Sequence, residues 1–208
     1  MILYYAPTAC SLASHIALEE IGVPFEARRV DLAKGEQTSP EFLKVNPQGR
    51  VPALIVDGET VTELPALLTY IASLNPDAGL VPPPGTLAFA RCFEWLGFLS
   101  STLHVAYAQF RRPVRFVPDG SPTSTIVSDE GKANTIAAYR EVERRLGDSW
   151  AAGEAYSIAD INLVPFHGWA WRFDFDMVAE CPKWTALVDR IKQRPAVERA
   201  TARENAPA

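Results

Sequence analysis

The chain has 208 residues, of which 48% are hydrophobic and 22% are charged, and its formal net charge is −5 at pH 7. This composition is typical of a globular protein with one or two domains, and the negative charge gives no indication of a nucleic-acid-binding surface. The sequence also lacks an apolar run near the roughly 18 residues of a membrane span and the basic start of a signal peptide, so we expect a cytoplasmic protein without nucleic-acid or membrane partners.

The first third of the chain predicts alternating strands and helices. Short β-rich runs are expected to form strands, and stretches with apolar residues at helical spacing are expected to form helices. In chain order, the expected elements are a strand at 2–5, a helix at 10–21, a strand at 25–32, a helix at 40–45, strands at 54–56 and 60–62, and a helix at 63–74. Asp57-Gly58 is a favoured hairpin turn between the last two strands. This order predicts an α/β layer that ends in an antiparallel hairpin.

The pattern changes after residue 76. Residues 77–85 contain three consecutive prolines and two glycines, which is typical of a linker. Beyond the linker the strand signals nearly vanish, and apolar residues recur at helical spacing. The expected helical stretches are 89–107, 136–146, 158–173 and 184–192. The sequence therefore predicts an α/β domain at 1–76, a linker at 77–85 and an all-helical domain at 86–208.

The segment 156–161 predicts the start of a helix in the second domain. Ser157 is placed to cap that helix, and Asp160 stands three residues later, where its carboxylate can return to the cap backbone. Tyr156 and Ile161 are placed to touch across the cap. This motif is a folding signal and carries no chemistry.

The three cysteines, Cys10, Cys92 and Cys181, are far apart in the sequence. There is no C-x-x-C motif and no paired Cys/His spacing. This usage argues against a disulfide scaffold, a zinc site or a dithiol redox motif, and it fits a reducing compartment.

Three loops of the first domain carry candidate functional residues. Cys10 stands at the opening of a helix, where backbone N–H groups favour an anion, so we expect a depressed pKa for its thiol. Val51 precedes Pro52 and a buried strand. A cis Val51-Pro52 bond, which we predict, would leave the Val51 backbone free to pair with a ligand's peptide bond. Glu63 offers a carboxylate between a strand and a helix. At one edge of a thioredoxin-like sheet, these groups form the set that a γ-glutamyl tripeptide thiol requires.

Each of these features also has a structural interpretation. The segment 46–54 is compatible with an ordinary loop-to-strand turn, and Cys10 with an inert buried cysteine. Ser11 is either a hydroxyl donor to a thiolate or a helix cap. His104 is explained equally well as a ligand contact and as a core histidine, whereas His15 is expected to be structural.

Three segments resemble the glutathione transferase family, and most of all its bacterial beta class. They are the start at 5–15 (YAPTACSLASH), the proline motif at 46–54 (NPQGRVPAL) and the capping motif at 156–160 (YSIAD). The resemblance extends over nearly the whole chain. It implies an α/β thioredoxin-like N-terminal domain plus an all-α C-terminal domain. It also implies a homodimer, glutathione as cosubstrate without a metal, and detoxification by transfer of glutathione to a small hydrophobic electrophile.

The resemblance further implies roles for particular residues. Cys10 and Ser11 would be catalytic, with Cys10 facing the glutathione sulfur, and Val51 would hold the cysteinyl backbone. Glu63 would bind the γ-glutamyl amino group, and Lys34 the glycyl carboxylate. The other residues expected to contact glutathione are Ala9, Arg50, Pro52, Leu64, Ser101 and His104.

Three positions depart from the family pattern. Leu64 stands where the family usually has Ser or Gly, Val105 where the class often has Lys, and Gly97 where it often has Asn. Polar contacts are therefore missing on one wall of the site, and we expect weakened glutathione binding. Two hypotheses follow. One is an enzyme that conjugates glutathione or uses it in thiol or peroxide chemistry, with Cys10 forming a mixed disulfide. The alternative is a non-catalytic ligand-binding or regulatory protein of the same fold.

Overall fold

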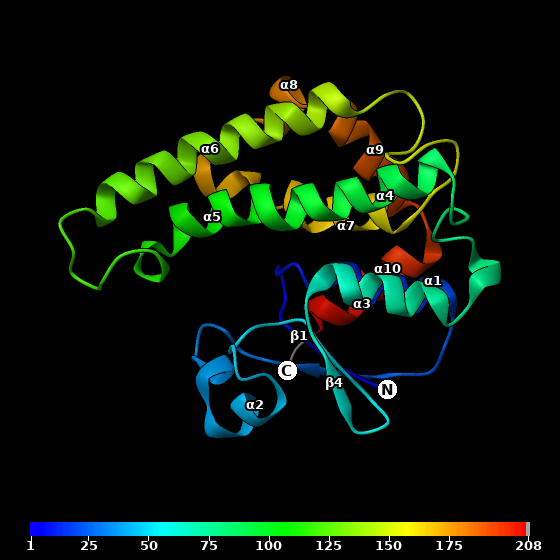
Figure 1. The fold of residues 1–208 in the computed structure, drawn as a ribbon, viewed down its shortest axis with the longest axis horizontal. Helices are drawn as coiled ribbons and strands as arrows, with labels where there is room; N and C mark the ends of the chain where they lie inside the picture. The colour runs from blue at the N-terminus through cyan, green and yellow to red at the C-terminus, as the bar shows by residue number, and fades with distance from the viewer. Residues whose placement is uncertain (207–208) are drawn as a thin grey trace.

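The computed structural model describes residues 1–206 and consists of two stacked parts (Figure 1). The N-terminal part holds a four-stranded sheet with helices on both faces, and the following part is built from helices. An α/β layer followed by an all-helical part is the fold class predicted from the sequence, and the prediction is confirmed.

The sheet consists of β1 (Ile2–Tyr5), β2 (Glu26–Arg29), β3 (Ala53–Val56) and β4 (Glu59–Val61), in the order β2-β1-β3-β4. β1 is parallel to β2 and antiparallel to β3, and β3 is antiparallel to β4. Asp57 and Gly58 have φ values of 49° and 87°, as a tight hairpin turn with two positive φ angles requires. The predicted hairpin is therefore confirmed. β2 is shorter than the predicted strand at 25–32 because its partner β1 ends at Tyr5.

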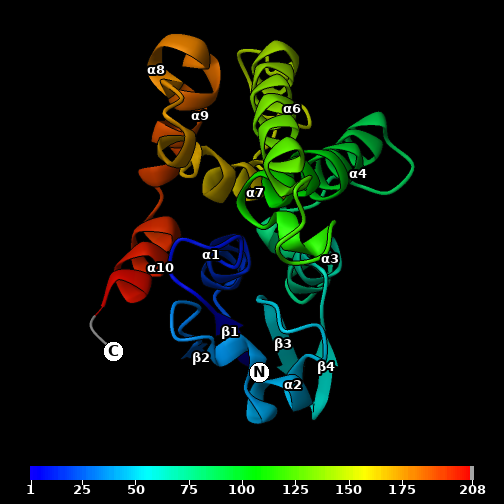
Figure 2. The same ribbon diagram turned by 90° about the vertical axis from the view of Figure 1, so that its left-hand side faces the viewer.

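Side chains of β1 alternate between the two faces of the sheet. Leu3 and Tyr5 are buried in the main core, on the side covered by α1 (Leu12–Ile21) and α3 (Leu64–Ser73). Tyr4 points to the opposite face and packs edge-on against Phe42 of α2 (Pro40–Val45), with ring centroids 5.7 Å apart. Figure 2 shows the sheet between these two sets of helices.

The last helix, α10 (Pro195–Asn205), lies beside α1 of the N-terminal part (Figure 2). The sequence predicted no helix beyond 192. Its buried face consists mainly of small residues and gives a weak apolar pattern. Ion pairs with α1 hold it in place: Arg194 meets Glu20 at 2.6 Å, and Glu19 is met by Arg199 at 2.7 Å and by Arg203 at 2.9 Å.

The helical part begins with one long element, which runs through α4 (Leu87–Phe98), a π-helical segment (Leu99–Leu103) and α5 (His104–Arg111). α6 (Ser124–Arg145) lies beside α5 and begins well before the predicted stretch at 136–146. Its first turns are polar, so the apolar pattern missed them. Gly131 permits this close packing, because a Cβ there would clash with the backbone of Phe110.

The remaining elements of the helical part are α7 (Ile158–His167), a 3₁₀ turn (Ala170–Phe173), α8 (Met177–Glu180) and α9 (Pro182–Lys192). The predicted capping box at the start of α7 is confirmed. The Asp160 carboxylate accepts hydrogen bonds from the backbone N–H of Ser157 at 2.9 Å and of Ala151 at 2.7 Å. Burial raises the pKa of Asp160 to about 6. Within residues 1–206, no helix is both long and apolar enough to cross a membrane.

Candidate functional site

A cavity of about 940 Å³ lies between the loops at one edge of the sheet and the helical part. The three loops singled out in the sequence all reach it, through Thr8–Cys10, Arg50–Pro52 and Thr62–Leu64. The opposite wall comes from α5, from the 3₁₀ turn Pro113–Arg115 that follows it, and from the segment around Trp169. The structure therefore brings together residues that are more than 150 positions apart.

Cys10 lies at the bottom of this cavity with 7% of its surface exposed. Its thiol is directed at the carbonyl oxygen of Val51, at 3.7 Å. Burial raises the pKa of the Cys10 thiol to about 12, so the predicted depression of its pKa is wrong. The reason is geometric: α1 begins at Leu12, so Cys10 precedes the Ser11 N-cap, and desolvation outweighs the nearby backbone N–H groups. At pH 7 the side chain is a neutral thiol.

Ser11 is completely buried and does not line the cavity. Its hydroxyl donates to the carbonyl of Ala6 at 3.2 Å and accepts from the N–H of Ala6 at 3.1 Å. Both bonds close the loop between β1 and α1. Ser11 is therefore placed to shape this loop, and its hydroxyl is not directed at a ligand in the cavity as the catalytic interpretation expected.

The loop before β3 presents the backbone of Val51 to the cavity. The Val51-Pro52 bond is cis, and β3 begins only at Ala53. Buried Asn46 braces the loop, because its side-chain amide donates to the Arg50 carbonyl at 2.7 Å and its side-chain oxygen accepts from the Gln48 N–H at 3.0 Å. The Val51 backbone thus stands outside the strand ladder in a fixed position.

Two residues beside the cavity have positive φ angles that are unusual for residues with side chains: Thr8 (62°) and Glu63 (65°). Strain of this kind persists where surrounding structure enforces it, and it is concentrated at functional sites. Glu63 is the last residue of the short loop between β4 and α3, and α3 begins directly after it at Leu64. Its exposed carboxylate forms no ion pair within the described part of the chain.

Thr8 is held by two residues that are not among the predicted glutathione contacts; Trp169 was expected only as a core or domain-interface anchor, and Arg172 was missed. The indole N–H of Trp169 donates to the Thr8 carbonyl at 2.9 Å, and the Arg172 guanidinium donates to the Thr8 hydroxyl at 2.9 Å. Arg172 also donates to the hydroxyl of Tyr107 at 3.0 Å. These contacts join the helical part to the loop that carries Cys10. No local pattern around Trp169 or Arg172 indicates this role.

Two predicted contact residues lie outside the cavity lining. Lys34 is exposed and pairs with Asp31 at 3.3 Å. Ser101 is exposed, and its hydroxyl donates to the Gly97 carbonyl at 2.8 Å. Its neighbour Ser100, in the same π-helical segment, lines the cavity in its place. The predicted residues that do line the cavity are Ala9, Cys10, Arg50, Val51, Pro52, Glu63, Leu64 and His104.

The helical wall of the cavity is strongly basic. Burial, together with the positive charges of Arg115, Arg112 and Arg50, lowers the pKa of His104 to about 4. His104 is therefore neutral at pH 7 and packs against the rings of Phe166 and Trp169. No cluster of His, Cys, Asp or Glu side chains in residues 1–206 has the arrangement of a metal site.

Comparison with known proteins gives one consistent result. A family model described as "Glutathione S-transferase, N-terminal domain" matches residues 1–73, and one described as "Glutathione S-transferase, C-terminal domain" matches residues 114–195. Glutathione S-transferase GstA of Escherichia coli O157:H7 is 32% identical over 207 residues, which is 98% of each chain. The structure of a sphingomonad glutathione S-transferase complexed with glutathione is 42% identical, covers 100% of both chains and has a TM-score of 0.81. A Sulfitobacter homologue with bound glutathione is 35% identical over 97% of both chains, with a TM-score of 0.90.

Proposed function

The chain belongs to the glutathione S-transferase family, and we propose that it transfers glutathione to small electrophiles in the cavity between its two parts. The observation that carries this proposal is the convergence of Cys10, the free backbone of Val51 and the carboxylate of Glu63 on one cavity. Family relatives with bound glutathione support it.

We assign the glutathione contacts as follows. The Val51 backbone pairs with the cysteinyl residue of glutathione as a neighbouring strand would. The Glu63 carboxylate binds the γ-glutamyl ammonium group, and the backbone N–H of Leu64, at the start of α3, binds the γ-glutamyl carboxylate. Ala9, Arg50, Pro52 and His104 complete the walls. Because Lys34 and Ser101 stand outside the cavity lining, we leave them out of this assignment.

Transfer requires the glutathione thiol to lose its proton, so that the thiolate can attack the electrophile. A neutral Cys10 suits this step, because its S–H can donate to a neighbouring thiolate, whereas an ionised Cys10 would repel it. The positive charge of Arg112, which acts on the Cys10 site, favours an anion there as well. The raised pKa of Cys10 makes conjugation a better fit than thiol exchange through a Cys10 mixed disulfide.

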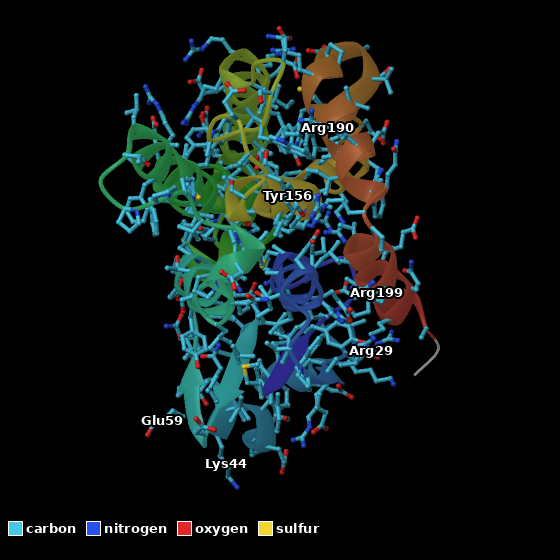
Figure 3. The ribbon with its side chains drawn as sticks, turned by 90° about the vertical axis from the view of Figure 1, so that its right-hand side faces the viewer. Arg29, Lys44, Glu59, Tyr156, Arg190 and Arg199 are labelled. Atoms are coloured by element: carbon cyan, nitrogen blue, oxygen red, sulfur yellow. The ribbon has the colours of Figure 1, made fainter. Side chains whose placement is uncertain are left out.

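Glu63→Gln tests the assignment with steady-state kinetics, using glutathione and 1-chloro-2,4-dinitrobenzene. Loss of one charge-assisted contact, worth about 1.5–3 kcal/mol, should raise KM for glutathione by roughly tenfold to a hundredfold. Glu59→Gln is the matched control, because Glu59 is an exposed acid of β4 that does not line the cavity (Figure 3). An equal KM in both variants would refute the role of Glu63.

The non-catalytic alternative is supported by Val105, which lines the cavity with an apolar side chain where the class often has Lys. Retention on immobilised glutathione without turnover of any electrophile would favour that alternative. Retention with turnover would favour the enzyme.

We further propose that the chain acts as a cytoplasmic homodimer in detoxification, with a thioredoxin-like domain at 1–76, a linker at 77–85 and a helical domain at 86–208. Leu74 and Leu87, on either side of the segment that joins the two parts, are exposed apolar side chains that a subunit contact would cover. Light scattering at micromolar concentration should give the mass of two chains, and the mass of one chain would reject the dimer.

A further inference from the structure

Six arginines line the cavity, and within the described residues none of them forms an ion pair. Arg29 belongs to β2, and Arg172 is hydrogen-bonded to Tyr107 and Thr8, which leaves four others. Arg111 and Arg112 lie at the end of α5, Arg115 lies in the turn that follows, and Arg50 faces them from the loop before β3. In the part of the chain that the structure describes, none of the four forms an ion pair or a side-chain hydrogen bond. Other arginines of this chain do pair with acids, namely Arg28, Arg91, Arg140, Arg144, Arg145, Arg194, Arg199 and Arg203.

Three of these unpaired arginines exert their positive charge on the same residue of the cavity wall, His104. Arg115, Arg112 and Arg50 all lower the pKa of His104. Partial desolvation, followed by the charges of Arg112 and Arg50, lowers the pKa of Arg115 itself. Like charges held together are unfavourable, and this chain has 25 acidic residues with which it could neutralise them. Because the positive charges on this wall of the cavity are not neutralised by acidic side chains, they favour the binding of an anion there.

Aromatic rings flank the same wall. Tyr107 is stacked on Trp169 with ring centroids 4.4 Å apart, and both line the cavity. Phe116 and Trp171 line its mouth with exposed rings, and Trp171 is 71% exposed. A ligand that combines a flat apolar ring with a negative charge would match both features, since guanidinium groups bind carboxylates with two parallel hydrogen bonds.

Glutathione accounts for only part of this wall. In the proposed function Val51 binds its cysteinyl residue, and Glu63 and the N-terminus of α3 bind its γ-glutamyl end on the sheet side of the cavity. The glycyl carboxylate is left without an assigned partner, and its single negative charge can neutralise only one of the four arginines. Arg111, Arg112 and Arg115 lie on the helical side.

We propose that the electrophile accepted by this protein is an anionic aromatic compound, whose carboxylate is bound by Arg112 and Arg115, with Arg50 beside them. This inference rests on the proposed function and specifies its second substrate class. In the reaction used to test it, the glutathione sulfur forms a bond to the ring carbon that carries chlorine. The carbon–chlorine bond breaks, chloride leaves with the electron pair, and the thiol proton passes to solvent. The carboxylate takes no part in the chemistry and serves for binding.

The experiment compares 4-chloro-3,5-dinitrobenzoate with its methyl ester at saturating glutathione. Each kcat/KM is divided by the uncatalysed rate with glutathione, so that intrinsic reactivity cancels. The wild type should prefer the anion. In the double variant R112Q/R115Q this preference should fall by at least about tenfold, the equivalent of one lost charge-assisted hydrogen bond. Added salt should reduce the wild-type preference in the same direction. R140Q, at an exposed arginine of α6 paired with Glu180, is the control and should keep the preference.

Binding supplies a second readout that does not depend on turnover. Quenching of tryptophan fluorescence by 3,5-dinitrobenzoate, which has no leaving group, should be saturable in the wild type and at least about tenfold weaker in R112Q/R115Q. An unchanged preference and unchanged binding in the double variant would overturn the proposal. So would a rise in KM for glutathione with an unchanged preference for the anion, because the arginines would then serve glutathione alone.

Failure of the proposed function looks different. In that case neither electrophile is turned over, whether or not the wild type is retained on immobilised glutathione. Loss of 3,5-dinitrobenzoate binding in R112Q/R115Q would then still support the anion site, and retained binding would overturn it.

Discussion

Two groups of arginines in this protein are used in opposite ways. On the face between α1 and α10, Arg194, Arg199 and Arg203 each pair with Glu19 or Glu20, whose side chains are only 7–8% exposed. Figure 3 shows Arg199 on α10, at the side where that helix covers α1. On the cavity wall, Arg112 and Arg115 have no acidic partner within the described residues.

Each group of arginines has a histidine nearby, and the two histidines have neighbours of opposite charge. His15 is fully buried beside α10 and has a carboxylate, Glu204, at 3.4 Å. The charges that act on His104 are cationic. Paired charges at the α1–α10 face hold distant segments together, whereas unpaired charges at the cavity stay available to a ligand. Ion pairs thus distinguish Arg194, Arg199 and Arg203 from Arg112 and Arg115 in a chain whose net charge is −5.

The paired group is tested most strongly by Glu19→Ala. This change leaves Arg199 and Arg203 without their partner, and because the arginines remain half exposed they recover part of their hydration. We expect the free energy of unfolding to fall by about 2–3 kcal/mol. Denaturant unfolding measures it. Glu198→Ala is the control, since Glu198 is an exposed acid of α10 that forms no ion pair within the described residues. An equal loss in both variants would show that the ion pairs are not what stabilises this face.

The difference between the two groups also marks the limit of what the sequence could predict. The β-α-β-α-β-β-α order, the hairpin at Asp57-Gly58 and the cap at Ser157 depend on neighbours within a few residues, and they were predicted correctly. α10 was missed because its stability comes from acids about 180 positions earlier in the chain. Its own apolar pattern is weak.

The candidate site was predictable to a similar degree. The loops at Cys10, Val51 and Glu63 were found because each combines a turn with one functional group, and they do meet at the cavity. The pKa of Cys10 could not be deduced, because it is set by burial rather than by the nearby helix start. The cationic wall was not foreseen, because ordinary arginines carry no local sign of whether an acid will lie beside them.

The histidine of the unpaired group predicts a pH dependence of stability. His104 has a pKa of about 4 in the folded protein, against 6.5 ordinarily, so the unfolded chain binds the extra proton between these values. Its contribution to stability is therefore lost as the pH falls from 6.5 toward 4. His104→Gln should remove about 2 kcal/mol of the stability difference between pH 7 and pH 5. Denaturant unfolding at both pH values measures this, and an unchanged difference would contradict the assignment.

Charges from both regions act on the Cys10 thiol, since Glu204 raises its pKa and Arg112 lowers it. Glu204→Gln should therefore speed alkylation of Cys10 by iodoacetamide, and R112Q should slow it, each by roughly threefold, since partly solvated charges shift a pKa by about half a unit. Rates at pH 8 are followed by mass spectrometry of the Cys10 peptide, because Cys92 and Cys181 are also free. Changes in the same direction in both variants would show that altered access, rather than charge, governs the reactivity.

The last prediction has the smallest expected effect, and it compares the two groups directly, because the same substitution of Arg by Gln is made once in each. R199Q removes a paired charge and should lower the free energy of unfolding by about 1 kcal/mol. R115Q removes a charge that is surrounded by other cations, so it should leave stability unchanged or raise it by up to about 0.5 kcal/mol, and this gain should vanish at high salt as the repulsion is screened. Unfolding of both variants at low and high ionic strength measures the contrast. If R115Q destabilised the protein as much as R199Q does, Arg115 would have a structural partner. Its positive charge would then not be free to bind an anionic substrate at the cavity wall.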